Sequence, residues 1–125
     1  LETVQQNIAS CEGINTLKKG TARDMRKNLD LDESLFDWSL YYCGNGLMDV
    51  SELLIVKSDN SAALETAEKA AASRLDAQKT NFDGYGTNQI DLLGHAITKK
   101  VGPYYFYAVS EHASTWEEVF MGLVK

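Results

Sequence analysis

Apolar and polar positions alternate most regularly between Phe36 and Cys43, a pattern typical of a β-strand. Every second residue there belongs to one set and the intervening residues to another, so the two sets lie on opposite faces of an extended backbone. After a glycine-containing loop, the stretch from Glu52 to Ser58 carries a run of apolar and β-branched residues. Such a run is typical of a strand buried on both faces. We therefore predict two consecutive strands.

Helical spacing of apolar residues marks two short segments before these strands. Val4 and Ile8 stand one helical turn apart and predict a short amphipathic helix at the start of the chain. Thr21 is followed three residues later by Asp24. This is the spacing of a capping box, in which side chain and backbone satisfy each other's hydrogen bonds at a helix start. A second short helix should begin there and end near Leu29.

The strongest helical pattern lies between residues 60 and 84. Apolar side chains recur there every three or four positions, and Asn60 or Ser61 can accept a hydrogen bond from a free backbone amide at the helix start. A last helix is predicted near the end of the chain, where Ser114 and Thr115 precede Glu117 in a second capping-box pattern.

Two further strands are predicted between these helices, at Ile97–Val101 and from Tyr104 onward. Gly102 and Pro103 join them and fit a two-residue hairpin turn whose first residue takes a positive φ. Residues 87–96 could add one or two helical turns. The resulting order, α-α-β-β-α-β-β-α, predicts an α+β fold. We expect a two-layer sandwich, with a four-stranded, mainly antiparallel sheet and helices on one face.

The length and composition suit one domain. The chain has 125 residues, of which 44% are hydrophobic, enough to bury one ordinary core. We expect a single domain over residues 1–125, with the helix and loop of residues 1–20 at its periphery.

Aromatic residues are the most distinctive side chains of the predicted sheet. A two-layer sandwich leaves one sheet face open, so strands with rings on both sides must expose some of them. Tyrosine tolerates water yet contributes strongly to binding once it is covered, which makes Tyr41, Tyr105 and Tyr107 candidate contacts for a ligand or partner. The alternative is that these rings pack across the strands and stabilise the sheet.

The charge of the chain excludes some partners. A formal net charge of -6 and a pI near 4.8 repel phosphate backbones, so we expect no nucleic-acid binding. No apolar run approaches the roughly 20 residues of a membrane-spanning helix. The chain begins at Leu1 rather than at methionine, and we expect it to be a processed product or a piece of a longer protein.

The two cysteines and two histidines match no metal or redox motif. Cys11 and Cys43 have neither a zinc-ligand spacing nor a Cys-x-x-Cys spacing. They could form a disulfide or stay as two separate buried thiols. His95 and His112 belong to no pattern that places two ligands on one helical face. We expect no metal, no cofactor and no catalytic residue.

An enzyme is the alternative, and it would need dispersed polar groups to converge in one cleft. The candidates for such a site are Glu52, Asp91, His95 and His112.

The order of these segments resembles an uncharacterised family called domain of unknown function four-three-five-eight. The similarity runs over about residues 20–124 through "NLDLDESLFDWSLYYC", "DVSELLIVKSDN", the alanine-rich helix and "KKVGPYYFYAVSEHA". Its most specific part is the acidic Glu52 that leads into "LLIVKS". The hairpin departs from the family pattern, because Gly102-Pro103 stands where a Gly-Asn-like turn is usual. No catalytic residues are known for the family, so none can be transferred.

The resemblance implies a location. The family occurs in small predicted lipoproteins of Gram-positive gut anaerobes, in which a lipid on a cysteine upstream of Leu1 would hold the domain outside the membrane. Cys11 is a poor candidate for that lipid, because no apolar leader precedes it. An exported setting would permit a disulfide between Cys11 and Cys43.

We therefore expect a non-catalytic extracytoplasmic domain that binds an envelope protein or a surface ligand through an aromatic sheet face. The alternatives are the enzyme with a dispersed site and a structural or self-associating module. The membrane would be contacted only through a lipid anchor absent from this chain, and the oligomeric state stays open.

Overall fold

The computed structural model of the chain describes residues 2–11, 13–44, 49–84 and 86–124. It confirms the α+β class. The helices are α1 (Glu2–Ala9), α2 (Ala22–Leu29), α3 (Ser61–Phe82), α4 (Thr87–Gly94) and α5 (Ala113–Val124), with short 3-10 turns at Ile14–Thr16 and Glu33–Leu35. The strands are β1 (Lys18–Lys19), β2 (Trp38–Cys43), β3 (Glu52–Lys57), β4 (Ile97–Val101) and β5 (Tyr104–Val109).

The five strands form one open antiparallel sheet in the order β1-β2-β3-β5-β4. The four predicted strands and their two hairpin pairs are confirmed, and the two-residue β1 extends the sheet beside β2. The turn between β4 and β5 is as predicted, because Gly102 has a φ of 55° and Val101 pairs with Tyr104. β3 lies at the centre of the sheet, and residues 52–56 are buried on both of its faces.

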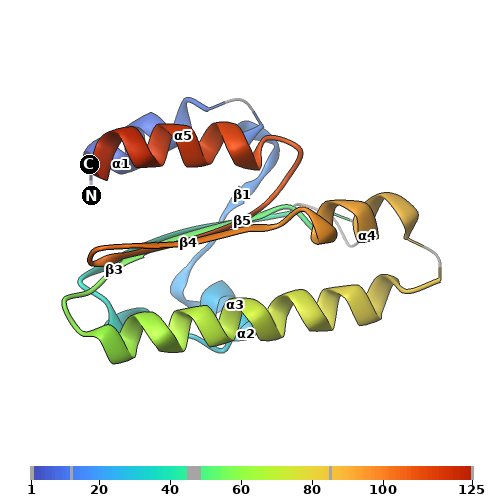
Figure 1. Cartoon of the computed structure of the whole chain (residues 1–125), viewed down its shortest axis with the longest axis horizontal. Coiled ribbons are helices and arrows are strands. Elements are labelled where there is room, and N and C mark those ends of the chain that lie inside the picture. The colour runs from blue at the N-terminus through green and yellow to red at the C-terminus, as the bar shows by residue number, and fades with distance from the viewer. Residues whose placement is uncertain (1, 12, 45–48, 85, 125) are drawn as a thin grey trace.

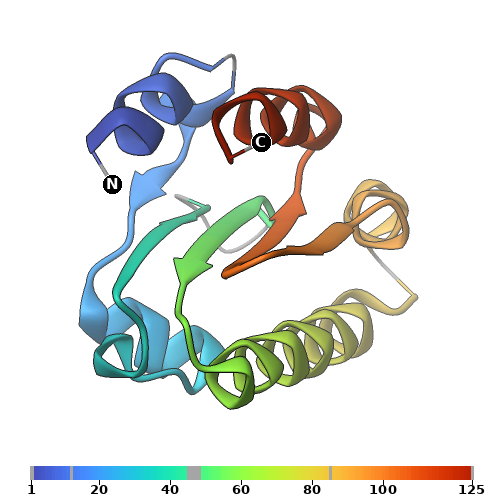
Figure 2. The ribbon, with the colours of Figure 1, turned by 60° about the vertical axis from the view of Figure 1, so that its left-hand side comes forward.

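Helices cover both faces of the sheet, so the predicted two-layer arrangement with helices on one face is wrong. Figures 1 and 2 show α1 and α5 side by side over one face and α2 and α3 beneath the other, with the sheet between them. The first helix, expected at the periphery, packs against α5 and buries Val4 and Ile8. The fold therefore has three layers.

Two apolar cores fill the spaces above and below the sheet. The core under α1 and α5 takes Leu40, Leu53 and Phe106 from the sheet, together with Trp116 and Phe120 from α5. The core against α2, α3 and α4 takes the alternate residues of the same strands, Tyr41, Leu54, Val56, Tyr105 and Tyr107 among them. Because both sets of alternating side chains are buried in β3 and β5, neither face is open at the centre of the described sheet, and exposed residues lie on the edge strand β4.

Local capping signals place the helix starts that position the site. Thr21 and Asp24 form the predicted capping box at the start of α2, and Asn60 accepts a hydrogen bond from the Ala62 amide at the start of α3. The capping box predicted at the start of the last helix is wrong. α5 begins at Ala113, so Ser114 lies inside the helix rather than before it.

Candidate functional site

The three candidate contact tyrosines are buried, which corrects their expected place on an open sheet face. Tyr41, Tyr105 and Tyr107 are 2%, 1% and 0% exposed. All three belong to the core on the sheet face that α2, α3 and α4 cover. Tyr105 and Tyr107 share this face because side chains two residues apart in a strand point the same way. Among the described residues the exposed large hydrophobic side chain is Leu35, which belongs to the 3-10 turn Glu33–Leu35 and not to the sheet.

Two of the three tyrosines serve a buried carboxylate. Glu52 is 2% exposed and accepts hydrogen bonds from the hydroxyls of Tyr41 and Tyr107, the latter at 3.1 Å. The Nε atom of Arg74 lies 3.2 Å from each carboxylate oxygen. Asn28 donates to the Tyr41 hydroxyl at 3.1 Å. Each oxygen of this buried charge therefore has at least two donors.

The sheet register creates this arrangement. Leu54 pairs with Tyr41 on one side and with Tyr107 on the other. Both tyrosines are therefore diagonal neighbours of Glu52, two residues away on the same face and within reach of long side chains. Arg74 completes the cluster from α3, and Asn28 from α2.

Burial keeps the two hydroxyls protonated. The loss of water contact raises the pKa of Tyr41 and of Tyr107, and the nearby charge of Glu52 raises each pKa further. An ionised tyrosine could not donate, so this direction preserves the hydrogen bonds to Glu52.

A polar cavity of about 440 Å³ opens beside this cluster, between β1, α2, the ends of β2 and β3, and α3. Its size lies within the range of small-molecule sites. The lining residues are Lys18, Asp24, Lys27, Asn28, Cys43, Gly44, Asp49, Ser51, Glu52, Arg74 and Gln78.

The charged groups that line this cavity differ in the number of hydrogen bonds and ion pairs that they make. Asp24 accepts from the backbone and hydroxyl of Thr21, and these hydrogen bonds, backbone first, lower its pKa. Asp49 accepts from the Ser51 amide at 3.0 Å. By contrast, Lys27 makes no hydrogen bond or ion pair within the described part of the chain.

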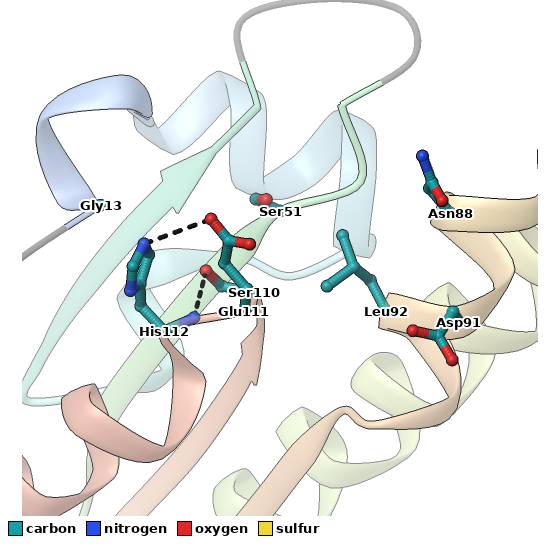
Figure 3. A pocket seen from close by; sticks show the side chains of 8 residues that line it. All are labelled: Gly13, Ser51, Asn88, Asp91, Leu92, Ser110, Glu111 and His112. Carbon is teal, nitrogen blue, oxygen red and sulfur yellow. Dashed lines mark hydrogen bonds and ion pairs between the residues drawn. The ribbon is translucent and has the colours of Figure 1, made fainter.

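A second cavity of about 510 Å³ lies on the other side of Ser51, which lines both. Figure 3 shows His112 and Glu111 on one wall and Asn88, Asp91 and Leu92 of α4 on the facing wall. Gly13 and Ser110 complete the lining.

The four polar groups of the enzyme hypothesis do not meet in one place. Asp91 and His112 line the second cavity from opposite walls (Figure 3), while Glu52 lines the first. His95 is exposed and contacts Asp91 instead. The Ser110 hydroxyl accepts from the backbone amide of His112 at 3.0 Å.

Within the described ranges, no group of three or more His, Cys, Asp or Glu side chains could hold a metal ion. No described helix combines the length and the apolar character needed to span a bilayer.

Cys11 and Cys43 are free thiols in this structure, with Cys43 buried and Cys11 partly buried. Cys43 belongs to the core against α2 and α3, whereas Cys11 packs against the core under α1 and α5. The sheet separates them. Burial raises the pKa of each thiol, which disfavours the reactive thiolate.

Sequence reasoning missed Arg74, although the pattern of α3 contained a signal for it. Ala67, Ala71 and Gln78 form the buried stripe of that helix, and Arg74 stands three residues after Ala71 and four before Gln78. A charged residue on a core-facing stripe indicates a buried partner. Glu52, which precedes the four apolar residues Leu53 to Val56 in β3, is the complementary signal.

Comparison with protein families matches residues 10–110 to the family described as Domain of unknown function (DUF4358). The comparisons with curated proteins and with solved structures gave no match. The matched range holds every strand of the sheet and the whole Glu52 cluster, and the chain belongs to the DUF4358 family.

Proposed function

We propose that this chain is a non-catalytic domain that binds a ligand in the polar cavity between α2, α3 and the ends of β2 and β3. The observation that carries this proposal is the buried Glu52 carboxylate, which holds Arg74 at the wall of that cavity through its Nε atom. The arginine is thereby oriented before any ligand arrives, and a group that is already oriented loses less entropy on binding.

Stability alone gives a weak reason for this cluster. Removing charges from water is costly, and apolar residues of similar volume often replace a buried ion pair without loss of stability. Glu52 also draws in two tyrosine hydroxyls that an apolar residue would not need. A binding role for the oriented Arg74 would explain why these polar groups are buried in the core.

The proposed setting is extracytoplasmic, with the domain anchored by a lipid in the full-length protein, and the ligand is an envelope component or a surface molecule. Support comes from the resemblance to predicted lipoproteins. Labelling of the full-length protein with a fatty acid tests this setting: incorporation that depends on a cysteine upstream of Leu1 is expected, and its absence would remove the anchor from the proposal.

A thermal-shift panel of small carboxylates, phosphates, sugars and dipeptides tests the binding site. Lys27 is exposed and lines the cavity, whereas Lys69 is exposed on α3 outside it. We expect at least one compound to raise the Tm of the wild type and of Lys69→Glu, but not that of Lys27→Glu. A panel without any effect, or equal shifts in both variants, would count against a ligand in this cavity.

A further inference from the structure

Hydrogen-bond donors of charged side chains are left unused in the cavity beside Glu52, whereas each carboxylate there already accepts at least one hydrogen bond. All three carboxylates that line it are engaged: Glu52 with two tyrosines and Arg74, Asp24 with Thr21 and Asp49 with Ser51. Two of the three described cations in the lining, Lys27 and Lys18, are not fully paired. Lys27 has no bonded partner among the described residues, and Lys18 lies 3.8 Å from Asp24, at the outer limit of an ion pair.

The third cation, Arg74, also has unused donors, and it is the best placed of the three to bind a ligand. Only its Nε atom contacts Glu52, and its terminal nitrogens, Nη1 and Nη2, bond to nothing in the described part of the chain. The side chain is 21% exposed, and it lines the cavity. A guanidinium presents its N–H groups in a planar fork that matches the two oxygens of a carboxylate or phosphate.

Charge decides between these two oxyanions. Lys18, Lys27 and Arg74 line the same cavity as Asp24, Asp49 and Glu52, so the formal charges of the described lining residues balance. A singly charged ligand adds one negative charge near two cations that lack full partners. A doubly charged phosphate adds a second negative charge, and the three carboxylates of the lining repel it.

We propose that the cavity binds a small ligand through a single carboxylate group, which the Nη1 and Nη2 atoms of Arg74 hold and Lys27 attracts. This inference rests on the proposed function and names its ligand class. The remaining polar lining, Asn28, Ser51 and Gln78, offers amide and hydroxyl groups to the uncharged part of the ligand.

Nuclear magnetic resonance titration with sodium acetate, acetamide and inorganic phosphate, at constant ionic strength, tests this choice. Acetate should shift the Arg74 Nε–H resonance and saturate. Acetamide has the same shape without the charge and should bind at least about tenfold more weakly, because a charge-assisted hydrogen bond is roughly twice as strong as a neutral one. Phosphate should also bind more weakly than acetate.

Variants separate the fork from a simple positive charge. Arg74→Lys keeps a cation near Glu52 but loses the fork, and should weaken acetate binding about tenfold or more. Lys27→Ala should weaken it as well, while the matched Lys69→Ala should not. Equal binding of acetate and acetamide, tighter binding of phosphate, full affinity in Arg74→Lys, or no saturable acetate shift would each overturn the inference.

The outcome for the proposed function can be read separately. If acetate fails but a neutral compound from the thermal-shift panel perturbs Arg74 and Lys27, the carboxylate inference is wrong and the cavity still binds a ligand. If no compound perturbs these residues, both proposals fail.

Discussion

At the scale of single residues, the molecule is organised around one buried acceptor. Glu52 begins a strand whose other residues are almost entirely apolar, and its charge is met by hydrogen bonds from β2, β5 and α3. Three elements that are distant in the sequence thus meet at one carboxylate. Any change to a donor leaves part of a buried charge unsatisfied.

The two buried tyrosines of β5 should therefore differ in their contribution to stability. Tyr107 donates to the charged Glu52, whereas the side chain that acts on the Tyr105 hydroxyl is the neutral Thr98. We expect Tyr107→Phe to lower the free energy of unfolding by about 2 kcal/mol and Tyr105→Phe by about 1 kcal/mol. Urea denaturation of both variants measures the difference. Equal losses would mean that Glu52 does not depend on Tyr107.

Sequence reasoning found some of these residues for a different reason. Tyr41 and Tyr107 were chosen as rings on an open face, and they prove to be hydrogen-bond donors inside a core. Arg74 was missed because the helical pattern of α3 rests on its regularly spaced alanine residues, which draw attention away from a single charged position. The meeting of Glu52 and Arg74, 22 positions apart, depends on how α3 lies across the sheet, and no local pattern contains that information.

At the scale of elements, local chemistry determined most boundaries. The Thr21 capping box, the Asn60 cap and the alternation in β2 all depend on residues within four positions of each other, and each was predictable. The placement of α1 over the sheet was not. Its apolar stripe of Val4 and Ile8 shows that one face is buried, but not against which partner.

The apolar character of both sides of β5 was the available clue to a three-layer fold. Phe106 and Ala108 point to one core, and Tyr105 and Tyr107 to the other. Rings on both faces can mean either exposure or two covered faces, and only long-range packing distinguishes these cases.

Two glycines of similar exposure should respond in opposite ways to alanine. Gly102 has a positive φ of 55° in the hairpin turn, while Gly122 lies in α5, and no neighbouring atom lies within 4 Å of the position that a Cβ would take there. We expect Gly102→Ala to destabilise by about 1 kcal/mol, because alanine disfavours a positive φ. Gly122→Ala should stabilise by about 0.5 to 1 kcal/mol through helix propensity. Thermal unfolding measures both; a loss of stability in Gly122→Ala would contradict the placement of that residue.

At the scale of the whole molecule, the three-layer fold removes tyrosines from water on the α2 and α3 side of the sheet. Burial raises the pKa of Tyr105 to about 12 and raises that of Tyr41 and Tyr107 further. In the unfolded chain a tyrosine has a pKa of about 10. The folded state therefore keeps protons that the unfolded state releases as the solution becomes alkaline.

This difference predicts a loss of stability above about pH 10. The stabilising contribution is complete below the unfolded pKa and is lost as pH rises toward the folded values. Each tyrosine should lower the free energy of unfolding by about 1.4 kcal/mol per pH unit, or about 4 kcal/mol for the three. Urea titrations between about pH 9 and about pH 11 measure this slope, and Tyr105→Phe should make it shallower. A flat profile would mean that these hydroxyls reach water.

In the proposed binding mode, Glu52 orients Arg74 to receive a carboxylate in the cavity between α2 and α3. A crystal structure of the protein grown in acetate would show whether this contact forms. We predict an acetate with its two oxygens about 2.9 Å from the Nη1 and Nη2 atoms of Arg74, while the Nε atom stays on Glu52. An Arg74 side chain turned away from Glu52, or an acetate bound in the cavity of His112 instead, would contradict the account.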